Sequence, residues 1–151
     1  MENAVKAPGK RRHGRELAVQ CLYQVDLTGD ASEEALAGFW ETQEDVPPAT
    51  RRFAEELIRG VLEQRAVLDE KISRYAEHWD LERIAVVDRN ILRLAIYEMM
   101  FRNDIPPVVS INEAIEIAKK YSTRESGAFV NGILDRIKFD LPRPARTASP
   151  S

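Results

Sequence analysis

The last third of the chain, residues 110–137, restricts the fold more than any other part, because two amphipathic helices follow one another there almost directly. Apolar side chains recur at intervals of three and four residues in both halves, which is the spacing of one face of an α-helix. Ser110 and Glu113 have the spacing of a Ser-x-x-Glu capping box, which predicts a helix start at Ser110. Gly127 is interpreted as the end of the polar turn between the two helices.

The same helical periodicity runs through the rest of the chain, and no segment has the strict alternation of a β-strand. Breaks rich in glycine and proline separate the periodic segments. We expect further helices over about residues 12–27, 32–40, 50–72 (with a kink near Gly60) and 86–102, and a turn or short helix at residues 78–81. The wide apolar surface of residues 86–102 indicates a central helix covered from two sides. Asp88 and Glu98 on this helix are either ordinary exposed positions or part of a mixed surface for a protein partner, with Asp88 receiving a basic side chain. The sequence predicts an all-α fold of six or seven helices.

Charge is distributed unevenly along the 151 residues, a length that fits one domain. Residues 1–15 contain five basic side chains and one acidic side chain, a net charge of +4, so the remainder carries −7 of the total of −3. We expect residues 1–10 to form a flexible basic arm, residues 11–141 the helical domain, and residues 142–151 a disordered tail. A basic arm on an acidic body concentrates attraction for phosphate in one place, although such an arm can also be merely solubilising.

Signatures of catalysis, metal binding or membrane insertion are not found in the sequence. The two histidines are far apart and lack cysteine or carboxylate neighbours at ligand spacing, and no glycine-rich phosphate loop or nucleophile motif occurs. The single cysteine and the absence of a long apolar run favour a reduced, cytoplasmic chain without a membrane span. We therefore expect a protein that is not an enzyme and needs no cofactor or metal.

Two features favour RNA binding. Lys10, Arg11, Arg12 and Arg15 lie at the entry to the first predicted helix, where guanidinium groups match phosphate oxygens. Phe129 lies at the edge of the apolar stripe of the last helix, where it is either a core residue or an exposed ring that stacks on an unpaired base. Our hypothesis is that the basic residues and this ring converge on one groove for single-stranded RNA.

Four segments, in this order and spacing, resemble the NusB family of bacterial transcription antitermination factors. They are RELAVQCLYQ, VVDRNILRLAIYEM, INEAIEIAKKYS and SGAFVNGILDRI, and the likeness extends from Arg11 to about Ile137. The resemblance implies an all-α fold of two three-helix bundles that share a core. It also implies a factor that binds boxA-type RNA together with the ribosomal protein NusE and helps RNA polymerase read through ribosomal RNA operons.

The same resemblance assigns roles to individual residues. It implies RNA contacts by Arg11, Arg12, Arg15 and Phe129, with Glu125 modulating RNA affinity, and contacts to NusE by Tyr23 and Asp88. Two departures remove positive charge from this RNA surface: His13 and Gly14 interrupt the basic run, and Ala128 precedes the phenylalanine where relatives often have lysine. We therefore expect weak RNA binding by the protein alone and tighter binding with its partner.

Two other interpretations remain open at this point. A related helical domain is attached to ribosomal RNA methyltransferases, but that interpretation needs a catalytic domain with a cofactor-binding loop. A purely structural helical protein could instead form a homodimer through its apolar central helix. Light scattering with and without RNA separates this scaffold from an adaptor, because a scaffold would show no RNA-linked change in mass.

Overall fold

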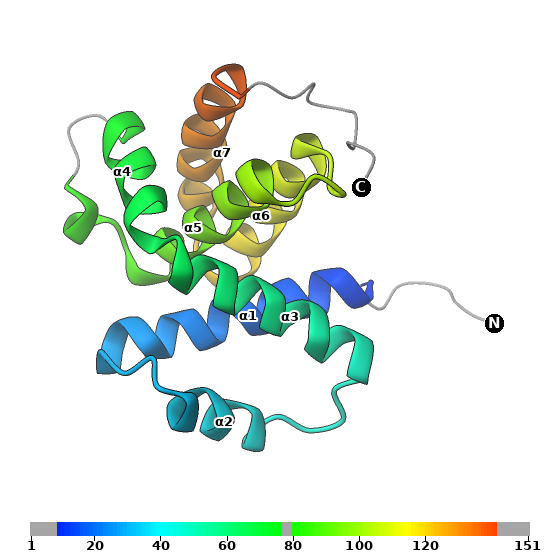
Figure 1. Ribbon diagram of the computed structural model, residues 1–151. Helices are drawn as coiled ribbons and strands as arrows, with labels where there is room; N and C mark the ends of the chain where they lie inside the picture. The colour runs from blue at the N-terminus through cyan, green and yellow to red at the C-terminus, as the bar shows by residue number, and fades with distance from the viewer. Residues whose placement is uncertain (1–8, 77–79, 142–151) are drawn as a thin grey trace.

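The computed structural model describes residues 9–76 and 80–141. Over these ranges the chain forms seven α-helices, one 3-10 helix and no strand, which confirms the predicted all-α fold (Figure 1). None of these helices is both long and apolar enough to cross a membrane. The elements are α1 (Lys10–Thr28), α2 (Glu33–Glu41), α3 (Pro48–Glu63), α4 (Arg65–Tyr75), η1 (Leu81–Arg83), α5 (Val86–Phe101), α6 (Pro107–Tyr121) and α7 (Arg124–Phe139).

Some predictions about the ends and the middle of the chain lie outside the described residues. These are the tail over residues 142–151 and most of the arm over residues 1–10, of which the structure describes residues 9 and 10. Lys10 is already the first residue of α1. Of the turn predicted at residues 78–81, residues 78 and 79 are not described, and η1 begins at Leu81.

The central position of α5 organises the molecule. Helices α1, α2 and α3 lie on one side in Figure 1 and α4, α6 and α7 on the other, and α5 packs against all of these except α2. Its residues Ile91, Leu92 and Ile96 are fully buried, and a single apolar cluster runs through both groups of helices. The prediction that this helix is covered from two sides is therefore confirmed. Most of its apolar side chains are thus already buried within the chain, although Phe101 at its end is 40% exposed.

Local sequence signals explain several helix ends. The hydroxyl of Ser32 accepts a hydrogen bond from the backbone N–H of Ala35 at 3.1 Å, as expected for an N-cap. Thr123 caps α7 in the same way by accepting from the N–H of Ser126 at 3.0 Å. Gly29 ends α1 in the left-handed conformation, with φ of 73°, where a side chain would be strained.

Three boundary predictions are wrong, and each has a physical reason. Helix α6 begins at Pro107, before the predicted capping box, because proline suits the first helical position. Ser110 and Glu113 bond to other helices instead of capping their own. Gly127 lies inside α7 because Thr123 supplies the cap four residues earlier. The predicted kink near Gly60 is a break at Gln64, between α3 and α4.

A buried acid ties α1 to the helices around it. Asp26 accepts hydrogen bonds from Asn90 at 2.9 Å and Arg93 at 2.8 Å, and it also pairs with Arg65. Burial alone would raise the pKa of Asp26, but these donors outweigh it and hold the pKa below its ordinary value. Arg93 also reaches Asp69 of α4, so one polar network connects α1, α4 and α5.

Glycine is required at position 60, where α3 meets α5. An added Cβ at Gly60 would overlap the ring of Tyr97, whereas an added Cβ at Gly38 in α2 would meet nothing within 4 Å. We expect Gly60→Ala to lower the free energy of unfolding by about 1 to 3 kcal/mol, because the tyrosine ring must shift. Gly38→Ala should leave it unchanged or raise it by up to about 1 kcal/mol, because alanine favours a helix. Urea unfolding of both variants tests this, and equal effects at the two positions would contradict it.

Candidate nucleic-acid and partner interface

The first turn of α1 presents three consecutive basic residues. Gly9 provides no side-chain cap, and the turn contains no acidic residue. Arg12 donates two hydrogen bonds of 2.8 Å to the carboxylate of Glu113 in α6, which keeps the pKa of Glu113 below its usual value. The guanidinium of Arg11 lies 4.5 Å from the centre of the Phe53 ring. Arg11 also lies 3.6 Å from the carboxylate of Asp104, so Lys10 and Arg11 are exposed cations, and both Arg11 and Arg12 have an acidic neighbour.

Arg15 does not belong to this exposed surface, contrary to the sequence prediction. Its side chain is only 4% exposed and donates two hydrogen bonds, of 2.7 and 2.9 Å, to the carboxylate of Glu98. Glu98 is itself 1% exposed, so the prediction of an exposed position there is wrong as well. Ser110 donates a further hydrogen bond of 2.7 Å to the same carboxylate. Arg15 therefore links α1 to α5 and α6 and is not available to phosphate in this structure.

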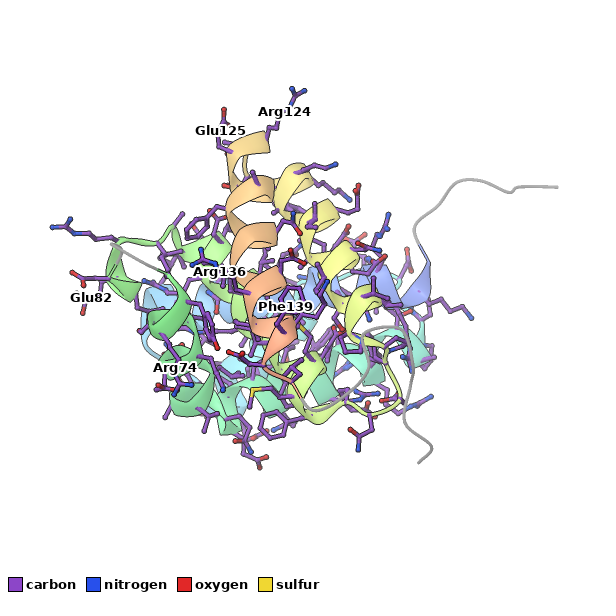
Figure 2. All side chains as sticks on the ribbon, turned by 90° about the horizontal axis from the view of Figure 1, so that it is seen from above. Arg74, Glu82, Arg124, Glu125, Arg136 and Phe139 are labelled. Atoms are coloured by element: carbon purple, nitrogen blue, oxygen red, sulfur yellow. The ribbon has the colours of Figure 1, made fainter. Side chains whose placement is uncertain are left out.

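Phe129 lies half-buried near the start of α7. It lines a pocket of about 250 Å³ together with Glu125 of α7, Asp88 of α5 and residues that follow η1. Figure 2 shows Glu125 projecting from the outer end of α7, opposite the end that carries Phe139. The predicted RNA residues Glu125 and Phe129 and the predicted partner residue Asp88 thus share one pocket.

Asp88 is buried at the start of α5, not exposed as the sequence suggested. Its side chain is 6% exposed, and one oxygen, Oδ2, accepts a hydrogen bond of 2.9 Å from the hydroxyl of Ser126. The other oxygen, Oδ1, has no hydrogen-bond partner among the described residues. Because a buried carboxylate oxygen needs a donor, this atom can receive a basic side chain or an N–H group from a bound molecule.

Tyr23 lines a second pocket, of about 450 Å³, between α1, α2 and the start of α5. Leu27, Val87 and Tyr121 contribute to the same pocket. Val87 is the residue before Asp88, so the pocket of Tyr23 and the pocket of Asp88 lie on either side of the start of α5. The two residues predicted to contact a protein partner therefore occupy neighbouring surfaces.

The basic start of α1 and Phe129 do not converge on one groove. Lys10 and Arg11 line a pocket against α3, and that pocket has no residue in common with the pocket of Phe129. Both figures place the start of α1 and η1, which lies beside the Phe129 pocket, at opposite sides of the molecule. A single ligand that contacts both must therefore extend across the surface between them.

Sequence reasoning missed Ser126, which links the two predicted kinds of contact. It holds Asp88 from α5 while lying one residue after Glu125 in α7. Nothing in the local sequence indicates this role, because the two bonded residues are 38 positions apart. Among the described residues, no group of three or more histidine, cysteine or carboxylate side chains is placed to hold a metal ion.

The fold defines an all-helical protein in which two groups of helices are joined through α5. The model of the NusB family matches residues 12–139. The transcription antitermination protein NusB of Anaeromyxobacter dehalogenans is 47% identical over 137 residues, which cover 91% of this chain and 95% of that protein. The chain belongs to the NusB family.

Solved structures agree with this assignment. NusB of T. maritima has a TM-score of 0.78 and 45% identity, covering 90% of this chain and 94% of that one. A structure of the antitermination factors NusB and NusE in complex with dsRNA has a TM-score of 0.79 and 26% identity, covering 87% of this chain and 98% of that one. The resemblance to the NusB family stated from sequence motifs is therefore confirmed.

We expect Arg15→Met to lower the free energy of unfolding by about 3 to 5 kcal/mol, because it leaves the carboxylate of Glu98 buried without its cation. Arg12→Gln is the matched control, since Arg12 pairs with Glu113 nearer the surface, and its effect should stay below about 1 kcal/mol. Urea unfolding followed by circular dichroism measures both. If the Arg15→Met variant were as stable as the wild type but no longer bound RNA, Arg15 would be an RNA-binding residue and not a structural one.

Proposed function

We propose that this protein is an RNA-binding transcription antitermination factor. It binds single-stranded boxA-type RNA together with the ribosomal protein NusE and, within the transcription elongation complex, helps RNA polymerase read through ribosomal RNA operons. It acts in the cytoplasm as an adaptor and not as an enzyme. The observation that carries binding of RNA together with NusE is the solved complex of NusB and NusE with dsRNA, whose NusB fold this chain shares over most of its length. The single strand and the boxA sequence follow from the family resemblance.

The geometry of the Phe129 pocket supports the RNA-binding part of the proposal. The ring of Phe129 is half-buried at the pocket wall, so one part is held by the core while the rest is accessible to a base. Stacking of an unpaired base on an aromatic ring contributes about 1 to 3 kcal/mol and tolerates different bases. Lys10, Arg11 and Arg12 supply positive charge for the backbone elsewhere on the surface.

The neighbouring pockets around the start of α5 support the role of NusE. A protein seated there would cover the apolar pocket of Tyr23 and supply a donor to the unpartnered oxygen of Asp88. Since Asp88 also lines the pocket of Phe129, NusE and RNA would lie next to each other on this protein. Each would then increase the affinity for the other, because the second ligand meets a surface already ordered by the first.

We expect Phe129→Ala to weaken binding of a boxA-type RNA at least fivefold, which corresponds to about 1 kcal/mol of lost stacking. Phe139→Ala is the matched control, because that ring is 80% exposed on the same helix and lies far from the pocket. Fluorescence anisotropy with and without NusE measures the effect. Equal RNA affinity of the two variants would exclude stacking on Phe129, and a large loss of thermal stability would identify it as a core residue.

We expect Asp88→Asn to weaken binding of NusE at least tenfold, about 1.4 kcal/mol, while RNA binding by the protein alone changes little. Asparagine retains the shape and can still accept a hydrogen bond from Ser126, but it removes the charge that would receive a basic side chain. Glu82→Gln, an exposed change in the adjacent η1, is the control. Calorimetric titration with NusE tests this, and unchanged NusE affinity would place the partner elsewhere.

A further inference from the structure

The starts of α1 and α3 lie side by side at one end of the molecule (Figure 1). The two helices run in the same direction, since Gly14 faces Thr50 and Phe53 while Asp26, near the other end of α1, pairs with Arg65 just after α3. Gly14 permits this close approach. An added Cβ there would lie 2.9 Å from a ring carbon of Phe53 and 3.2 Å from the carbonyl oxygen of Thr50.

Both helices begin without a side chain that would cap their positive N-terminal end. Neither Gly9 before α1 nor Pro47 before α3 provides a side-chain cap, and neither first turn contains an acidic residue. The partial positive charge of each helix start favours an anion, and at α3 the backbone N–H groups that remain to bind one are those of Ala49 and Thr50, because Pro47 and Pro48 have none. Because the helices are parallel and adjacent, the two favourable fields add.

A pocket of about 300 Å³ lies between these helix starts. Three basic side chains line it: Lys10 and Arg11 from α1 and Arg52 from α3. Neither Lys10 nor Arg52 forms an ion pair with any described residue, whereas Arg11 lies over the ring of Phe53 and 3.6 Å from the carboxylate of Asp104. The one carboxylate in the lining, Glu56, accepts a hydrogen bond of 3.1 Å from Arg102, so its charge is partly balanced.

A buried hydroxyl provides a separate indication of a ligand. Thr50 lines this pocket and is only 1% exposed, yet its Oγ1 has no hydrogen-bond partner among the described residues. Buried polar groups are nearly always hydrogen-bonded, because an unmet one costs about 1 to 3 kcal/mol. An oxygen of an anion in the pocket would supply the missing acceptor.

We propose that this pocket binds a backbone phosphate of the RNA, at a site formed by Arg52, Thr50 and the two helix starts in addition to the basic residues of α1. The proposal rests on the RNA-binding function proposed above and adds residues of α3 to it. The pocket is open at the surface, so the backbone of a strand can reach it. It lies on the side of the molecule away from Phe129, which gives an extended RNA two separate points of attachment.

The test compares Arg52→Gln with Arg51→Gln in the full-length protein. Both remove one positive charge, but Arg51 pairs with Glu55 and lies over the ring of Trp40, outside the pocket. The affinity for a single-stranded boxA-type RNA is measured over a salt series by fluorescence anisotropy. One lost phosphate contact should reduce the slope of log K against log salt by about 0.7 for Arg52→Gln, or about fourfold in affinity at 0.15 M salt, and Arg51→Gln should behave as the wild type.

Thr50→Val provides a second, independent readout. Valine has nearly the same shape and removes an unpaired hydroxyl, so the melting temperature should stay the same or rise. RNA affinity should fall while the salt slope is unchanged, because no charge is lost. A lower melting temperature with unchanged RNA affinity would show that the hydroxyl only supports the fold.

The remaining outcomes separate this proposal from the proposed function. If the wild type binds RNA and Arg52→Gln binds it with the same affinity and salt slope, the phosphate pocket is excluded and the RNA-binding function stands. If the wild type binds no RNA even with NusE, both are excluded. If, with RNA binding the same in both, inorganic phosphate stabilises the wild type but not Arg52→Gln, the pocket binds a free anion, and the proposal that it holds an RNA phosphate is overturned while the RNA-binding function stands.

Discussion

The buried carboxylate of Glu98 ties helices of the two groups together. It accepts two hydrogen bonds from Arg15 of α1 and one from Ser110 of α6 while lying on the central helix α5. A buried charge without its partner is strongly unfavourable, so the three helices are held in one relative position. The exposed cations one turn before Arg15 are therefore presented on a fixed helix start, and their spacing from α3 and α6 is set by the core.

Helices and their burial were predictable from the sequence wherever the signal was local and periodic. The central position of α5 followed from its wide apolar surface, and the Ser32 cap followed from its position before two acids. Arg15 and Ser110 were misassigned for a common reason. Each has the sequence context of a surface residue, but each bonds to Glu98, which lies 83 and 12 positions away respectively. A local pattern carries no information about such a partner.

The candidate site was likewise predictable only where the signal was local in the sequence. Family resemblance named Asp88, Glu125 and Phe129 one by one, but only the packing of α5 against α7 brings them into one pocket. Ser126 could not be found from the sequence, since serine near a helix start usually serves its own helix. Conversely, the basic residues and Phe129 are separated by the body of the fold, which no charge pattern could indicate. Contacts to RNA and to a protein partner thus meet at α5, while the basic end lies apart.

Gly14 changes how the basic end of the molecule should be understood. In the sequence it interrupts a run of positive charge, and a longer run would add one more cation. In the fold it is a position at which α1 and α3 approach closely, because even a methyl group would press against Thr50 and Phe53. The strength of the electric field at this end therefore depends on how near two helix dipoles lie to each other, and an additional arginine at position 14 would raise the net charge while moving its sources apart.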